Sequence, residues 1–212
     1  MKLVIFGASG GTGRCLVEQA LEAGYQVTAF VRNPSASPRS YGNLKVVKGD
    51  VLDAAAVDAA IADQDAVLVA LGVGRSGGTV LSQGTLNIVN AMRKHEVKRL
   101  VVESSYGVAE SFGEASFTCR FLLNRLLKAT YADKAKQEEI IRRSGLEWVI
   151  VRPPRLTNGF GTRNYRIGEH VRLGVRHSVS RSDVANFMLQ MTRDSAWLSK
   201  APTMWYEARP GY

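Results

Sequence analysis

The feature that most constrains the fold of this chain is a glycine-rich turn near its start, set between an apolar run and a helical pattern. The run is Leu3–Phe6, the turn reads Gly7-Ala-Ser-Gly-Gly-Thr-Gly13, and apolar residues at helical spacing follow as far as Ala23. A short apolar run ended by glycine is typical of a strand that is buried on both faces. The start of the chain therefore predicts a strand, a tight turn and a helix in immediate succession.

Such a turn is suited to the diphosphate of a dinucleotide. Its glycines let the backbone approach the ligand closely, and the helix N-terminus offers free amides and a partial positive charge. The spacing is GxxGxxG rather than GxGxxG, and a strand–helix turn without a ligand is the alternative. The strand, turn and helix context favours dinucleotide binding. The contacts expected here come from Gly7, Ser9, Gly10, Gly11, Thr12 and Gly13.

Strand and helix patterns alternate along the rest of the chain. Strands are expected at residues 27–31, 44–47, 66–71, 99–102 and 146–151, with a terminal strand at 204–207. Helices are expected at residues 53–62, 81–95, most of 117–143, and 182–191, the last with Ser182 as its cap. This alternation predicts a Rossmann-like α/β fold, a doubly wound parallel sheet with helices on both faces. We expect a single domain over residues 1–212, in which the Gly- and Arg-rich residues 155–180 form a small substrate-binding excursion.

Composition excludes several other classes of protein. No apolar run approaches the roughly 18 residues of a membrane helix. The apolar run at the start of the sequence is too short for the hydrophobic region of an export signal. The 2 cysteines cannot form a disulfide framework or a four-cysteine zinc site, and the 3 histidines are not at metal-ligand spacing. The net charge of +9 is spread without a basic run or a nucleic-acid recognition motif. We therefore expect a cytoplasmic monomer or small homo-oligomer with no metal, no membrane and no nucleic-acid partner.

The end of the second expected strand indicates the type of cofactor. An NAD-selective site usually has an acidic residue there, which binds the ribose hydroxyls. Here the strand ends in Arg32 with no acid nearby, and Ser35 follows in the next loop. An arginine at this place can pair with a 2′-phosphate and stack on adenine. The pattern favours NADP(H) over NAD(H), with a solvated loop arginine as the alternative.

Two further strand ends add expected contacts to the same ligand. Asp50 and Val51 follow the third strand, where the carboxylate suits the amino group of adenine and the valine suits its face. An acidic cap for the next helix is an equally good interpretation of Asp50. Leu71 and Gly72 end the fourth strand, and ligands of such sheets collect at the carboxyl ends of the strands.

Taken together, the segments GASGGTG, VTAFVRNP, GDVLD and VRPP resemble the atypical short-chain dehydrogenase/reductase group, in its NAD(P)-binding NmrA-like set. The chain is most similar to the branch of small flavin reductases and biliverdin-IXβ reductases, and the similarity spans nearly its whole length. The resemblance implies NADPH as cofactor, with flavins, linear tetrapyrroles or other conjugated acceptors as substrates. It also implies a nicotinamide site near Ser104, Ser105, Lys134, Pro154, Arg155 and Leu156.

The same resemblance names the catalytic candidates and shows two departures. Ordinary short-chain dehydrogenases carry Tyr-x-x-x-Lys, whereas here Tyr131 is only three residues before Lys134. Residues three apart still share a helix face, so Ser105, Tyr131 and Lys134 remain the catalytic candidates while the proton donor stays open. Arg155 stands where the branch has a histidine, and an arginine cannot serve as a general acid at working pH.

Residues 152–181 contain 7 arginines and a single acid, Glu169. They form either a pocket wall for an anionic small-molecule substrate or a solvated basic surface, and the sequence favours neither. Two functions are consistent with all of these patterns. One is an NADPH-dependent oxidoreductase that passes hydride to a flavin, quinone, tetrapyrrole or other conjugated acceptor. The other is a non-catalytic regulator of NmrA-like type that senses NADP(H).

Overall fold

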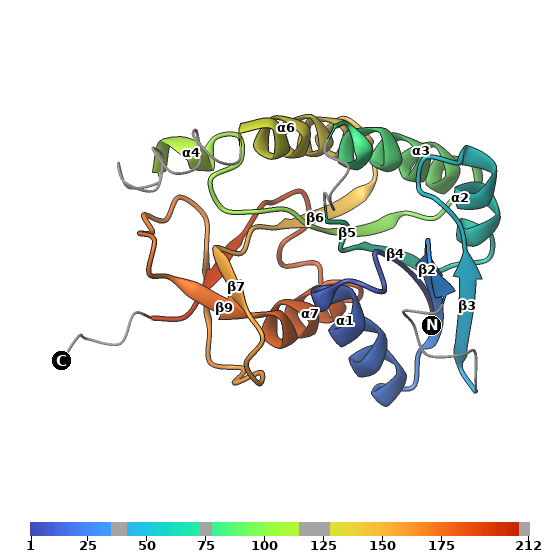
Figure 1. Cartoon of the computed structure of the whole chain (residues 1–212), viewed down its shortest axis with the longest axis horizontal. Coiled ribbons are helices and arrows are strands. Elements are labelled where there is room, and N and C mark those ends of the chain that lie inside the picture. Colours follow the sequence, from blue (N-terminus) through green and yellow to red (C-terminus); the bar gives the residue numbers. More distant parts are fainter. Residues whose placement is uncertain (35–41, 73–77, 115–127, 208–212) are drawn as a thin grey trace.

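A parallel sheet forms the centre of the protein. The computed structural model describes residues 1–34, 42–72, 78–114 and 128–207 (Figure 1). Within these residues the sheet has the strand order β3-β2-β1-β4-β5-β6, and each neighbouring pair is parallel. Its strands are β1 (Lys2–Phe6), β2 (Gln26–Val31), β3 (Leu44–Lys48), β4 (Ala66–Val69), β5 (Arg99–Glu103) and β6 (Glu147–Val151). The Rossmann-like α/β fold expected from the sequence is confirmed.

Helices cover both faces of this sheet (Figure 1). The two layers are α1 (Gly11–Glu22) with α7 (Arg181–Gln190), and α2 (Ala54–Ile61) with α3 (Val80–Lys94) and α6 (Lys128–Arg142). Alternate residues of each strand pack into opposite layers; Leu3 of β1 lies in the core cluster of the first layer and Val4 in that of the second. The inner strands β1 and β4 are therefore continuous apolar runs rather than alternating ones, as a sheet covered on both faces requires, whereas the edge strand β3 carries two lysines.

Helices α2 and α7 are each capped at the N-terminus by the side chain of the residue before the helix. Asp53 caps α2, because its side chain accepts hydrogen bonds from the amides of Ala55 and Ala56. The cap of α7 is Ser180, whose hydroxyl oxygen accepts from the amide of Asp183 at 3.0 Å. The expectation of Ser182 as this cap was wrong, because the helix begins earlier, at Arg181.

The first turn of α3 is capped by a side chain of α6. Asp133 accepts hydrogen bonds from the amides of Leu81 and Ser82, at 2.9 and 3.2 Å. Gln137, one turn later, donates to the hydroxyl of Thr85 at 2.9 Å. These buried polar contacts fix α6 along α3, and they replace the capping residue that α3 lacks at its own N-terminus.

The excursion expected at residues 155–180 contains short strands. β7 (Arg155–Thr157) pairs in parallel with β9 (Ser178–Ser180), and β8 (Arg166–Gly168) pairs antiparallel with β10 (Thr203–Trp205). Their runs of three residues are too short for a periodicity that a sequence reveals. The four-residue helix α4 (Ser111–Glu114) lies between β5 and α6 in the chain.

The strand order locates the place where a ligand binds. The chain proceeds outward from β1 to β3 in one direction and then from β4 to β6 in the other. In such sheets the crevice beyond the carboxyl ends of the strands, at the point of reversal, is the usual ligand site. That point lies here between β1 and β4. Among the described residues, no helix is both long enough and apolar enough to span a bilayer.

Candidate active site

The turn after β1 is shaped by its glycines. Gly7 has a φ of +80°, and a Cβ built on it would lie 2.3 Å from the carbonyl oxygen of Ala70. A Cβ on Gly13 would lie 2.0 Å from the carbonyl oxygen of Gly7. Neither position has room for a side chain. The turn and the first residues of α1 therefore pack directly against the ends of β1 and β4.

The N-terminus of α1 is arranged for an anion. Gly10 is its N-cap residue, no side chain caps the helix, and the amide of Gly10 donates to the carbonyl oxygen of Gly7 at 2.9 Å. First-turn amides that no side chain satisfies, together with the helix dipole, favour binding of a negatively charged group. The hydroxyl of Thr12 points away from this end and donates to the Glu103 carboxylate at 3.0 Å.

A cavity of about 240 Å³ opens beside the turn, at the carboxyl ends of β1 to β4. It unites segments that lie far apart in the sequence and that were all predicted to bind one ligand. Its lining is Gly7, Ser9, Gly10, Phe30, Val31, Arg32, Gly49, Asp50, Val51, Ala70, Leu71, Gly72 and Val80. The glycine cradle, the cavity and the basic residue at its edge fit the diphosphate and adenosine of a dinucleotide.

Arg32 and Asp50 line this cavity after β2 and β3. Both side chains are exposed, so each is accessible to a ligand. The Asp50 carboxylate accepts a hydrogen bond from the amide of Leu52 at 3.0 Å, whereas Asp53 caps the following helix. The interpretation of Asp50 as that cap is therefore wrong, and its role toward adenine stays a prediction. Ser35 lies outside the described residues.

Val51 is held in place from α3. Its carbonyl oxygen accepts from the side-chain amide of Asn87 at 3.0 Å. A Cβ built on Gly84 would lie 2.7 Å from the γ-carbons of Val51, so the helix approaches to within contact of this wall. The wall that Val51 gives to the cavity is therefore fixed on two sides.

The chain segments after β5 and β6 continue side by side beyond the sheet. The amide of Ser104 donates to the carbonyl oxygen of Val151 at 2.8 Å, and that of Tyr106 to Pro153 at 2.9 Å. This pairing brings Ser105 and the Pro154 region to the same edge, which is the region predicted for the nicotinamide. The hydroxyl of Ser104 points into the protein, where it donates to the Glu138 carboxylate at 2.6 Å.

Lys134 is buried and lies in the field of carboxylates, among them Glu103. Burial lowers the pKa of Lys134 more than the neighbouring negative charges raise it. Burial likewise raises the pKa of Glu103 more than Lys134 and the hydroxyl of Thr12 lower it. Both shifts favour the uncharged forms, because a charge is costly in a site that excludes water. Lys134 interacts electrostatically with Glu103, and Glu103 accepts a hydrogen bond from Thr12 at the start of α1.

A buried ion pair supports this region from behind. The guanidinium of Arg152 makes two contacts with the Glu138 carboxylate, one of them at 3.1 Å, and donates to Glu110 at 3.0 Å. Glu138 also accepts from Ser104, so α6, β5 and β6 meet at one carboxylate. Arg152 is only 3% exposed. Arg152 is therefore part neither of a pocket wall for an anionic substrate nor of a solvated basic surface, the two interpretations offered for the arginine-rich segment.

Tyr131 stands near Ser105 but its hydroxyl is engaged. It donates to the backbone carbonyl of Tyr106 at 3.1 Å. The hydroxyl of Tyr106 in turn donates to the carbonyl of Val171 at 3.1 Å and accepts from the amide of Leu173 at 3.0 Å. These contacts join α6 and the excursion to the residue after Ser105. The catalytic roles of Ser105, Tyr131 and Lys134 stay predictions.

The other arginines of the segment are divided between surface and site. Arg155 is exposed at the start of β7, and Leu156 packs against the core. Arg166 pairs with Glu207 at 3.2 Å on the surface. Arg181 alone lies half-buried against the diphosphate turn, beside Gly11. The segment is therefore not one basic wall.

Glu103 and Arg181 contact the first residues of α1, Thr12 and Gly11, and sequence reasoning did not place them there. A signal for Glu103 was present, because a carboxylate ends an otherwise apolar buried strand. Arg181 has no such signal, since it meets Gly11 only through the packing of α7 against α1.

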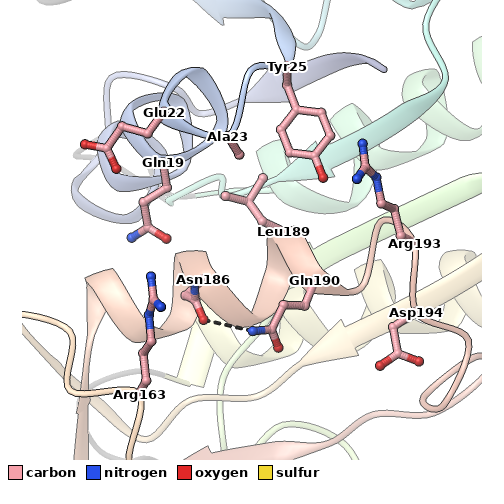
Figure 2. Close-up of a pocket in the computed structure, with 10 residues that line it drawn as sticks. All are labelled: Gln19, Glu22, Ala23, Tyr25, Arg163, Asn186, Leu189, Gln190, Arg193 and Asp194. Atoms are coloured by element: carbon pink, nitrogen blue, oxygen red, sulfur yellow. Dashed lines mark hydrogen bonds between the residues drawn. The ribbon is translucent and has the colours of Figure 1, made fainter.

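A larger cavity than the one beside the turn after β1 is not the candidate site. It has a volume of about 720 Å³, and Figure 2 shows side chains of α1 and α7 facing each other across it. Its residues come from the C-terminal halves of both helices, from the turns that follow them, and from Arg163 of the excursion, whereas the carboxyl edge of the sheet lies at the N-termini of the helices. Charges of both signs line it, and Arg193 lies 4.8 Å from the ring centroid of Tyr25. Nothing in this lining converges on a reacting group.

Residues 7–195 match the family described as NAD(P)H-binding, which is 189 of the 212 residues and includes every segment that lines the candidate cavity. The chain belongs to the NAD(P)H-binding family. An uncharacterized chloroplastic protein of Arabidopsis thaliana is 32% identical over 174 residues, or 77% of this chain and 62% of that protein. The chain thus spans less than two thirds of this relative. A reductase named pytE from Aspergillus terreus is 24% identical over 256 aligned positions, covering 96% of this chain and 97% of that protein.

Two solved structures show the same fold. One is ChuY, named an anaerobillin reductase, from Escherichia coli O157:H7, with a TM-score of 0.84, 22% identity and full coverage of both chains. Another is a short-chain dehydrogenase/reductase of Veillonella parvula in complex with NADP, with a TM-score of 0.82 and 18% identity, covering 97% of this chain and 94% of that one. The NAD(P)-binding family stated from the motifs is confirmed by the family match, and these structures share its fold.

Proposed function

We propose that this protein is an NADPH-dependent reductase that passes hydride to a flavin, quinone, linear tetrapyrrole or other conjugated acceptor. The observation that carries the proposal is the 240 Å³ cavity, in which the glycine turn, Arg32 and Asp50 meet at the carboxyl edge of the sheet. Family membership supports a bound NAD(P)H, and two of the similar proteins are named reductases.

The preference for NADPH rests on Arg32. It lies at the end of β2, it is exposed, and it shares the cavity with Asp50 rather than with an acid at its own strand end. An arginine there favours a 2′-phosphate by charge and by paired hydrogen bonds. The neighbour crystallised with NADP is consistent with this choice.

In the proposed reaction the chain contributes binding and orientation. Reduced nicotinamide, when bound, supplies the hydride. The turn at Gly7–Gly13 and the N-terminus of α1 hold the diphosphate, so the nicotinamide end is directed toward Ser105 and the Pro154 region. Lys134 is buried behind this edge. Its electrostatic interaction with Glu103 helps to hold the end of β5 in place. Hydride transfer to a conjugated acceptor gains most from such positioning, and the proton can come from solvent.

The experiment is to follow oxidation of NADPH with FMN, dichlorophenolindophenol and biliverdin as acceptors. We expect turnover with at least one of them and slower turnover with NADH. A chain that binds NADPH tightly but reduces none of the three contradicts the proposed activity.

The alternative function is a regulator that senses NADP(H) without chemistry. One observation favours it: the hydroxyl of Tyr131 is bonded to the backbone of Tyr106, so the family's usual proton donor is not presented as in ordinary short-chain dehydrogenases. The acceptor assay separates the two functions, because a sensor binds the nucleotide and leaves it unchanged.

The compartment also stays a proposal. The sequence favours the cytoplasm, while the Arabidopsis relative is named as chloroplastic.

A further inference from the structure

Arg181 lies directly over the diphosphate turn. A Cβ built on Gly11, the first residue of α1, would lie 2.6 Å from both Cδ and Nε of Arg181 and 3.5 Å from Cζ. The arginine occupies this place only because residue 11 has no side chain. The positively charged group and the positive end of the helix are thus in contact.

The position of Arg181 is fixed by its neighbours. Its guanidinium donates to the side-chain carbonyl of Asn158 at 2.6 Å. Asp183, one turn into α7, accepts from the amides of Thr162 and Arg163, each at 2.9 Å. The loop that carries Asn158 is therefore tied to the start of α7, and the two together hold the arginine over Gly11.

Within the described residues, most of the N–H donors of the Arg181 guanidinium have no hydrogen-bond acceptor. A guanidinium has five N–H donors, and the bond to Asn158 uses one of them. None of the ion pairs found in the described part of the chain includes this residue. The buried carboxylate of Glu103 interacts with it only through its field. A half-buried cation with open donors beside a helix N-terminus is matched to a phosphate oxygen.

We propose that Arg181 is a direct ligand of the cofactor diphosphate, closing over it from the side of α7. This rests on the proposed function only in taking a dinucleotide as the ligand. It assigns a binding role to a residue of the C-terminal segment, whose arginines were otherwise candidates for substrate. The diphosphate is then held by the α1 amides below and by a guanidinium above.

The test compares three variants by calorimetric titration. In Arg181→Gln the dissociation constant for NADPH should rise about ten- to hundredfold, since a charged ligand of a phosphate is removed. In Arg181→Lys, which keeps the charge and loses the fork, the rise should be smaller. Arg143→Gln is the matched control: it removes the same charge from an exposed pair with Glu139 and should leave the affinity unchanged.

A second ligand, 2′-AMP, separates the diphosphate from the adenosine end. It has no diphosphate, so Arg181→Gln should leave its affinity within about twofold of wild type. Equal NADPH affinity in Arg181→Gln and wild type overturns the assignment, as does a parallel loss for NADPH and 2′-AMP. Such results leave the proposed reductase intact. Conversely, tight NADPH binding without reduction of any acceptor overturns the reductase and leaves Arg181 a diphosphate ligand. A wild-type chain that binds no NADPH overturns both.

Discussion

Gly7 and Gly24 share a left-handed backbone and differ in what surrounds them. Their φ values are +80° and +77°, but a Cβ on Gly7 would meet the Ala70 carbonyl oxygen at 2.3 Å, whereas one on Gly24 would meet nothing within 4 Å. Gly24→Ala should therefore cost about 1–2 kcal/mol of unfolding free energy, from the backbone alone. Gly7→Ala should cost about 1–3 kcal/mol more, from overpacking. Urea unfolding of both variants measures the difference, and equal losses would contradict the close approach of the turn to β4.

Arg32 is the residue on which the choice of nucleotide depends. Arg32→Ala should raise the dissociation constant for NADPH about ten- to hundredfold and leave that for NADH nearly unchanged, because only NADPH carries the 2′-phosphate. Fluorescence titration with both nucleotides checks this. Equal weakening of the two would mean that Arg32 only stacks on adenine, and an unchanged NADPH affinity would mean that it is a solvated loop residue.

Single residues were predictable where the signal is local. Gly7 and Arg32 were found because a turn and a strand end are features of adjacent residues. Glu103 and Arg181 were not, because each acquires its role from a residue more than ninety positions away along the chain or from a neighbouring helix. Arg152 shows the same limit, since its buried partner Glu138 is on another element.

At the scale of elements, α6 carries more polar contacts than its sequence suggests. Its apolar pattern is weak, and buried polar groups hold it: Asp133 caps α3, and Glu138 binds Arg152 and Ser104. Lys134 lies between these two anchors. The orientation of the catalytic candidate thus depends on how firmly α6 is held against α3, β5 and β6.

The buried pair of Glu138 and Arg152 is the strongest of these anchors. Arg152→Met should cost about 3–5 kcal/mol of unfolding free energy, because it removes the closest cation from the buried Glu138 carboxylate and leaves it Ser104 and the more distant Arg142. Arg143→Met, which breaks an exposed pair with Glu139 just after the end of α6, should cost less than about 0.5 kcal/mol. Chemical denaturation of both variants provides the comparison. Losses of equal size would contradict the buried character of the first pair.

At the scale of the whole molecule, Asp183 joins α7, the excursion and the C-terminal strand region. Its burial by itself raises the pKa, but the hydrogen bonds from Tyr206 and from Thr162 and Arg163 outweigh burial and lower it. A carboxyl whose folded-state pKa is depressed stabilises the fold above its unfolded-state pKa. That stabilisation is lost as pH falls through the folded-state value.

Acid should therefore lower the free energy of unfolding of the wild type more than that of the Asp183→Asn variant. The variant should be about 2–4 kcal/mol less stable at pH 7, since a buried carboxylate that accepts several hydrogen bonds is lost. The gap should narrow below about pH 4, where the Asp183 carboxyl of the unfolded chain takes up a proton while that of the folded chain, with its lower pKa, does not yet do so. Urea unfolding at a series of pH values measures it. A gap that stays constant through this range would contradict a depressed pKa in the folded state.

The architecture as a whole was the most predictable level. Alternating buried strands and amphipathic helices fix a parallel sheet and the edge at which ligands bind, so the cavity of the turn, Arg32, Asp50, Val51 and Leu71 was foreseen as one site. The excursion was not resolved into strands, because runs of three residues carry no periodicity and are formed by pairing with distant segments. The substrate side of the site depends on that excursion.

The central claim is that the turn after β1 and the cavity beside it bind a dinucleotide with a 2′-phosphate. Calorimetric titration of the whole chain with NADPH and with NADH tests it most directly. The account predicts a single site per chain, with NADPH bound about tenfold or more tighter than NADH. Absence of heat with both nucleotides, at concentrations that saturate ordinary reductases of this kind, would contradict it.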